Sequence, residues 1–298
     1  MFSGEDMQRL WILAPALALT LTACGKKQTG TYEVAEAAEA AQGSNVELLV
    51  AGADALWEKR GEEASLKQSL AGYEGVLAVD PTNRHAYNRL VRGYYFLGDG
   101  VLTDPDAKSA AWDTSVTWGK KCLALNSDFV VRVEAGEGEG PAGAAFTKDD
   151  VPCMYWMASA LGKWARAESL ATILQYKDQI YMWMGYLDTL DNEFFYTASS
   201  RYLGAYWAAL PSFAGQDLDK SEEFFKAAIE ANPDHFGNRV LYADYWAKKT
   251  QNKAIFTEQL TYVVNGDVNV IPSLVPEQAA EQAKAQFLLD NIDEYFAE

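Results

Sequence analysis

Few side chains of this chain could take part in covalent, metal or acid–base chemistry, and the main candidates are three cysteines and two histidines. Cys122 and Cys153 could form a disulfide in an oxidising compartment, or they could be two small buried side chains; the sequence leaves both interpretations open. His85 and His235 are isolated, and neither has a neighbour that would make a metal pair or a nucleophile–base pair. The chain also has no H-E-x-x-H, G-x-S-x-G or P-loop motif. We therefore expect a binding protein that is not an enzyme, without catalytic residues, a metal site or a cofactor.

The remaining cysteine, Cys24, directly follows an apolar segment. Residues 10–23 read LWILAPALALTLTA, a length typical of a signal peptide and short for a membrane span. Together with the small residues before it, Cys24 resembles the lipobox of bacterial lipoproteins. This resemblance implies that residues 1–23 are removed and that acyl chains on Cys24 anchor the protein without a transmembrane helix. Because acidic residues precede the apolar segment, translation could start at Met1 or at Met7.

Seven large aromatic residues between positions 154 and 207 could bind a ligand. Tryptophan and tyrosine suit the walls of a cavity because each ring offers an apolar face and one hydrogen-bond donor. The alternative is that the rings pack between helices as an ordinary core. The candidates are Trp156, Trp164, Tyr181, Trp183, Tyr202, Tyr206 and Trp207.

The elements that must position these residues are helices. From about residue 45 onward, apolar residues recur with the 3.6-residue period of an α-helix, and no segment makes a convincing sheet. Two segments, 69–81 and 221–233, share a spacing of small, aromatic and aliphatic residues before a proline, as in the second helix of a TPR repeat. A third segment, 115–127, is a degenerate copy. We expect an all-α fold of TPR-like antiparallel helix pairs, arranged as an irregular right-handed solenoid or bundle.

The chain divides into a signal peptide (1–23), a lipidated tether (24–44) and one helical domain (45–298). Within that domain, residues 127–149 are expected to interrupt the helices. Residues 129–133 could form a short extended piece, and the glycines and glutamates of 136–143 predict a mobile acidic loop. The letters of 138–143 match G-x-G-x-x-G, but Glu137 and Glu139 would repel a pyrophosphate and no βαβ unit surrounds them.

The net charge is −17, which excludes nucleic acid as a partner because an acidic surface repels it. The charge is compatible with a body that a lipid, rather than electrostatic attraction, holds at a membrane.

Part of the helical region resembles a known family. The segments DVPCMYWMASALGKW (150–164), GAYWAALP (204–211), DKSEEFFKAAI (219–229) and the stretch from 242 to 256 are similar to the TatT family, the T-component lipoproteins of TRAP transporters. The family usually has two glycines before the 219–229 helix, where this chain has Ala214 and Gly215. The resemblance implies a periplasmic, TPR-like lipoprotein that partners a TRAP solute-binding protein, forms trimers, and has a cavity for a hydrophobic or organic-acid ligand.

These expectations lead to one main functional hypothesis. The chain would be a membrane-anchored accessory lipoprotein of a TRAP-type uptake system, facing the periplasm, with the outer membrane favoured over the inner. It would dock a solute-binding protein and shelter a small or hydrophobic ligand in an aromatic cavity. The alternative is a TPR-like scaffold for envelope assembly with no small ligand. The sequence identifies neither the solute nor the oligomeric state.

Overall fold

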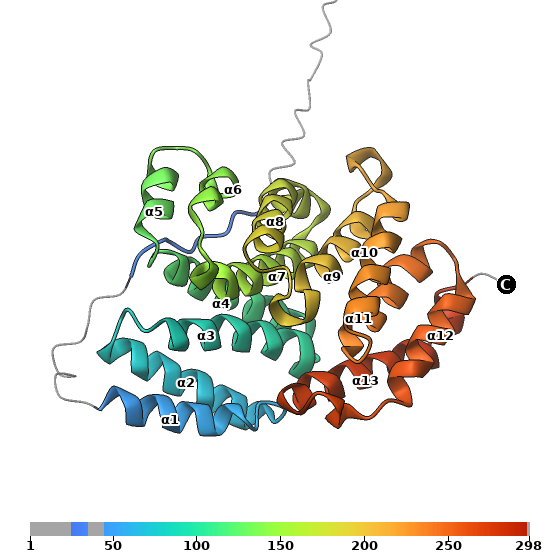
Figure 1. Ribbon diagram of the computed structural model, residues 1–298, viewed down its shortest axis with the longest axis horizontal. Coiled ribbons are helices and arrows are strands. Elements are labelled where there is room, and N and C mark those ends of the chain that lie inside the picture. The colour runs from blue at the N-terminus through green and yellow to red at the C-terminus, as the bar shows by residue number, and fades with distance from the viewer. Residues whose placement is uncertain (1–24, 35–44, 297–298) are drawn as a thin grey trace, which may run out of the picture.

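The computed structural model describes residues 25–34 and 45–296, and within these residues it is built from helices and connecting segments without β-strands (Figure 1). The all-α prediction is therefore confirmed. The α-helices are α1 (Val46–Trp57), α2 (Glu63–Val79), α3 (Arg84–Phe96), α4 (Pro105–Leu123), α5 (Ser127–Glu134), α6 (Glu139–Ala142), α7 (Val151–Glu168), α8 (Leu170–Asp191), α9 (Phe194–Ala209), α10 (Leu218–Ala231), α11 (Phe236–Leu241), α12 (Lys253–Val264) and α13 (Val275–Asp290).

Neighbouring helices pack in pairs, and a buried serine marks three of the contacts. Ser69 on α2 donates its hydroxyl to the carbonyl of Ala53 on α1 at 2.9 Å. The Ser115 hydroxyl on α4 donates to the carbonyl of Val91 on α3 at 2.8 Å. The Ser221 hydroxyl on α10 donates to the carbonyl of Gly204 on α9 at 2.7 Å. These are the small residues that open the three TPR-like segments. Because each small hydroxyl group donates a hydrogen bond to the backbone of the neighbouring helix, the two helices can approach closely without a buried, unpaired polar group.

Gly204 on α9 shows how close this approach is. A Cβ atom at Gly204 would lie 2.8 Å from Cγ of Phe225, which is fully buried on α10. Gly204→Ala should therefore lower the free energy of unfolding by about 1–2 kcal/mol, because the overpacking cost exceeds the gain in helix propensity. Gly75→Ala is the matched control, since its Cβ would point into open space on α2. Urea denaturation should show Gly75→Ala as neutral or stabilising; equal effects of both substitutions would contradict the packing argument.

The last long helix returns to the beginning of the domain. Glu277 on α13 forms ion pairs with Arg60, which follows α1, and with Arg92 on α3, each at 2.7 Å. The guanidinium groups of both arginines also lie over the ring of Trp57. Figure 1 shows the resulting ring-like arrangement, in which α13 reaches the end of the α1–α2 pair. This closure encloses the space between the two halves of the chain.

Residues 127–149 differ from the prediction of an extended piece followed by a mobile loop. Residues 127–134 form α5, and the glutamate- and glycine-rich part forms α6 and two short 3₁₀ turns (Gly143–Ala145 and Lys148–Asp150). Tertiary contacts explain the difference. The ring of Phe129 is fully buried and packs on Phe146 and Trp183, and the indole N–H of Trp183 donates to the carbonyl of Glu139 at 2.9 Å.

The signal peptide and Cys24 lie outside the described residues, as does 35–44. Residues 25–34 of the expected tether are described, and they are extended and packed on the helical body (blue in Figure 1). Among the described helices, none has the length and apolar character needed to cross a bilayer.

Candidate functional site

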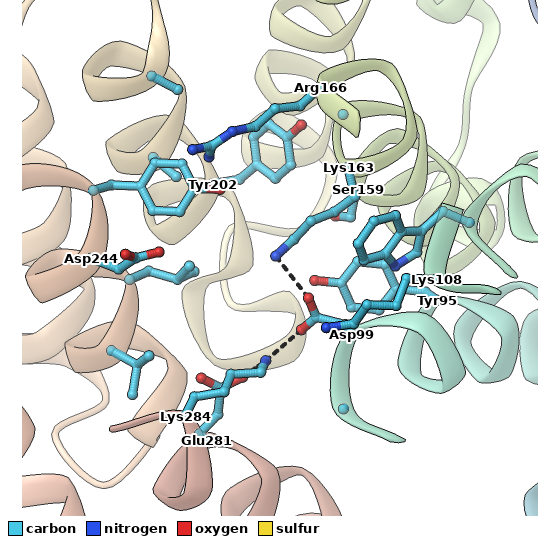
Figure 2. A pocket seen from close by; sticks show the side chains of 18 of the residues that line it. Tyr95, Asp99, Lys108, Ser159, Lys163, Arg166, Tyr202, Asp244, Glu281 and Lys284 are labelled. Atoms are coloured by element: carbon cyan, nitrogen blue, oxygen red, sulfur yellow. Dashed lines mark hydrogen bonds and ion pairs between the residues drawn. The ribbon is translucent and has the colours of Figure 1, made fainter. Parts of the chain in front are cut away.

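A cavity of about 660 Å³ lies between the N-terminal and C-terminal halves of the fold (Figure 2). Its wall is drawn from α4, α7, α8, α9 and α13 and is largely apolar. Two π-helical turns complete it: η2 (Leu97–Val101), which continues α3, and η6 (Tyr242–Ala247), which continues α11. Such wide turns are frequent at functional sites because they displace side chains from the ordinary helical register.

The η2 turn brings an aspartate into the cavity. Gly98 packs against the indole of Trp112, and Gly100 packs against the ring of Phe96, at separations that leave no room for a Cβ atom. Gly98 and Gly100 thus allow the turn to lie against two aromatic rings. Asp99 is the residue between these two glycines. Residues 98–100 therefore form a polar turn whose position is fixed by its contacts with these rings.

Asp99 is bound by two lysines from distant parts of the chain. Its carboxylate pairs with Lys163 on α7 and with Lys284 on α13, both at 2.7 Å (Figure 2). Lys284 also pairs with Glu281 at 2.7 Å. Burial alone would raise the pKa of Asp99, but the two ammonium groups outweigh it and hold that pKa well below its usual range. The carboxylate is therefore ionised throughout the physiological range.

Several hydrogen-bond donors in the cavity wall have no partner among the described residues. The indole N–H of Trp112 and the hydroxyl of Ser159 are buried without a hydrogen bond. The ammonium group of Lys108 makes no ion pair or hydrogen bond with the described residues, and burial lowers the pKa of this group. Figure 2 shows the Lys108 side chain beside Asp99. Unsatisfied donors in an apolar enclosure favour a ligand that supplies acceptor oxygens.

The charge of the wall also favours an anion. The cavity is lined by five cationic and three acidic side chains, although the net charge of the whole chain is −17. The cations are Lys108, Lys163, Arg166, Lys177 and Lys284, and the acids are Asp99, Asp244 and Glu281.

Of the seven aromatic residues predicted to bind a ligand, only Tyr202 and Tyr206 line this cavity. Trp164 and Trp183 are almost completely buried in the core, and Trp156 packs in an aromatic cluster with Tyr95 and Tyr155. Tyr181 and Trp207 each pack on the ring of Tyr206. These five residues do not line this cavity, and a role for them in ligand binding stays a prediction.

The aromatic residues that the sequence interpretation missed include Tyr95, Trp112, Tyr155 and Tyr245, all of which line the cavity. The missed charged residues are those around Asp99. The only local signal was the pair of glycines beside Asp99, since its lysine partners lie 64 and 185 positions away.

The other residues with chemical potential lie elsewhere. Cys122 on α4 and Cys153 on α7 form a disulfide, with their Cα atoms 6.2 Å apart. His85 interacts with Asp54 at 2.8 Å, and His235 is buried; neither lines the cavity. Within residues 25–34 and 45–296, no group of three His, Cys, Asp or Glu side chains is arranged to hold a metal ion.

The fold is thus an all-α arrangement of helix pairs around a mostly apolar cavity with five cationic side chains in its wall. The comparison with known families makes the assignment specific. The model of the TRAP transporter T-component family matches residues 132–296, more than half of the chain. The chain belongs to this family and is a component of a TRAP transporter system. No curated protein matches it.

Proposed function

We propose that this T-component binds a small amphipathic anion in the cavity and docks a TRAP solute-binding protein, which brings or takes that ligand. The carrying observation is the combination of an apolar cavity of about 660 Å³ with buried donors that lack partners. A carboxylate would accept from the Lys108 ammonium group, and an apolar body would contact Ile180, Leu288 and the tyrosine rings. Cavities of this size suit ligands of drug-like dimensions.

The ligand part of the proposal is tested with a medium-chain carboxylate. Isothermal titration of the purified chain with decanoate should show binding, whereas its methyl ester, which lacks the charge, should bind at least tenfold more weakly. Lys108→Ala should weaken decanoate binding by about 10- to 100-fold, since a charge-assisted hydrogen bond is worth about 1.5–3 kcal/mol. Lys67→Ala removes an exposed lysine on α2 and should leave the affinity unchanged. Equal affinities for acid and ester would contradict an anion site.

The docking part of the proposal has its own experiment. Crosslinking in intact cells, followed by capture of this chain, should recover a TRAP solute-binding protein as a major partner. The same capture should report whether the chain forms a homotrimer, as we expect of the family. Recovery of envelope-assembly proteins without a solute-binding protein would favour the scaffold alternative.

The anchoring part concerns Cys24. We propose that Cys24 is acylated and holds the body on the periplasmic side of the envelope, at the outer membrane rather than the inner. Metabolic labelling with an alkyne fatty acid should mark the wild-type chain but not Cys24→Ser. Membrane fractionation then identifies the bilayer. Absence of label from the wild type would contradict the anchor without affecting the ligand proposal.

A further inference from the structure

The segment that follows Cys24 is fixed to the helical body by a series of specific contacts. The backbone N–H of Lys26 donates to Thr172 Oγ1 at 3.1 Å, and that of Gln28 donates to the Tyr176 hydroxyl at 2.8 Å. The Gln28 side chain donates to the Asp113 carboxylate at 2.8 Å. The segment therefore starts on α8 and crosses to α4 (Figure 1).

The end of the segment is held as well. The carbonyl of Gly30 accepts from Lys120 on α4 at 3.1 Å, and the ring of Tyr32 packs on Phe129 of α5, with centroids 5.1 Å apart. The Lys120 ammonium group lies 5.2 Å from the Tyr32 ring centre. These contacts with three helices show that residues 25–34 are part of the folded body rather than a free linker.

The position of Gly25 limits where a lipid can emerge. A Cβ atom at Gly25 would lie 3.0 Å from the carbonyl oxygen of Ala171, so this residue touches the first turn of α8. Cys24 is covalently bonded to Gly25, and consecutive Cα atoms are about 3.8 Å apart. Acyl chains on Cys24 would consequently enter a bilayer directly beside the corner where α7 ends and α8 begins.

The surface of this corner suits lipid headgroups. Leu170 is 53% exposed there, and Lys26, Lys27 and Arg166 are exposed beside it. The nearby acid Glu168 pairs with Lys26 at 2.9 Å. The corner is thus locally cationic, with an exposed apolar side chain, on a body whose net charge is −17. Cations near a membrane surface are attracted to its phosphates, while the acidic remainder is repelled.

We infer that the α7–α8 corner, defined by Lys26, Lys27, Arg166 and Leu170, is the surface that rests on the membrane. The inference depends on the proposed acylation of Cys24. The docked segment would fix the body in one orientation, with α1, on the opposite side of the molecule in Figure 1, directed away from the bilayer. Arg166 and Lys177 also line the cavity, so that side of the cavity would lie near the headgroups.

The test uses the mature protein, acylated on Cys24, in phosphatidylcholine vesicles that contain a headgroup-nitroxide lipid. A fluorophore is attached to Leu170→Cys or, as the matched control, to Leu48→Cys on α1, which is 70% exposed. Quenching should be several-fold stronger at position 170 than at position 48. Equal quenching, or stronger quenching at 48, in protein that floats with the vesicles would overturn the orientation. Failure to float would instead refute the anchor on which the orientation depends.

A second set of variants tests whether the docked segment sets the orientation. Thr172→Val with Tyr176→Phe removes two hydrogen bonds to the segment, whereas Thr189→Val removes a hydroxyl elsewhere on α8. In the double variant, flotation should persist while quenching at position 170 falls toward the level at 48. Thr189→Val should leave the difference intact. Unchanged quenching in the double variant would show that these hydrogen bonds do not orient the body.

Discussion

Asp99→Ala should lower the free energy of unfolding by about 3 kcal/mol, because it leaves the ammonium group of Lys163 without an ion pair and leaves Lys284 with Glu281 as its remaining partner. The lysine side chains are 28% and 31% exposed, so the loss falls at the lower end of what a broken buried pair costs. Urea denaturation followed by circular dichroism measures it. Glu58→Ala, at an exposed carboxylate, is the control and should cost less than about 0.5 kcal/mol.

The pH dependence of that loss follows from the direction of the pKa shifts. The folded pKa of Asp99 lies below its unfolded value of about 3.9. Its stabilisation is therefore complete above that value and is lost as the pH falls through the folded pKa. Burial alone would lower the pKa values of Lys163 and Lys284, but the Asp99 carboxylate raises both, so their contribution is complete below about pH 10.4 and is lost at higher pH. The wild-type advantage should be constant from about pH 5 to 9.

A compensated variant separates charge from packing. Asp99→Leu combined with Lys163→Met and Lys284→Met replaces all three charges with apolar side chains and should recover most of the stability lost in Asp99→Ala. If the triple variant is as unstable as Asp99→Ala, unpaired charge is not the cause. The triple variant should also bind decanoate differently, since it removes two of the five cations of the cavity.

The helix pairs were predictable because their signals are local. Apolar periodicity identifies the helices, and an aromatic residue follows Ser69 and Ser221 by four positions in the two full TPR-like segments. Ser115 opens the degenerate third segment. The hydroxyl-to-carbonyl bonds give that spacing its physical meaning. In contrast, the glycines and glutamates of 127–149 have turn-like local preferences, and distant rings such as Trp183 make the segment helical. Tertiary burial overrides a weak propensity of this kind.

The cavity was less predictable, because residue type does not distinguish a core ring from a wall ring. Trp183 and Tyr202 are both aromatic residues on helices, yet Trp183 packs on Phe129 and Phe146 while Tyr202 lines the cavity. The charged centre was harder still. Asp99, Lys163 and Lys284 meet only because α13 returns to the beginning of the domain, and one sequence contains no signal for that return.

Removing the disulfide through Cys122→Ala with Cys153→Ala should destabilise the protein by about 3–4 kcal/mol, because the link closes a loop of 31 residues and restricts the unfolded chain. For a chain of this size, that corresponds to a fall in Tm of about 6–8 °C. The cysteines join α4 to α7, and these two helices pack directly on each other. The disulfide therefore constrains the hydrophobic core to which both cysteines belong.

Reductant provides the matched comparison for this prediction. A thiol reductant should lower the Tm of the wild type to that of the double variant, and it should leave the double variant itself unchanged. If reductant does not alter the wild type and both thiols react with an alkylating reagent after unfolding, the cysteines are reduced in the native protein. Since stable disulfides form in oxidising compartments, a linked pair in protein taken from cells would also support export to the periplasm independently of Cys24.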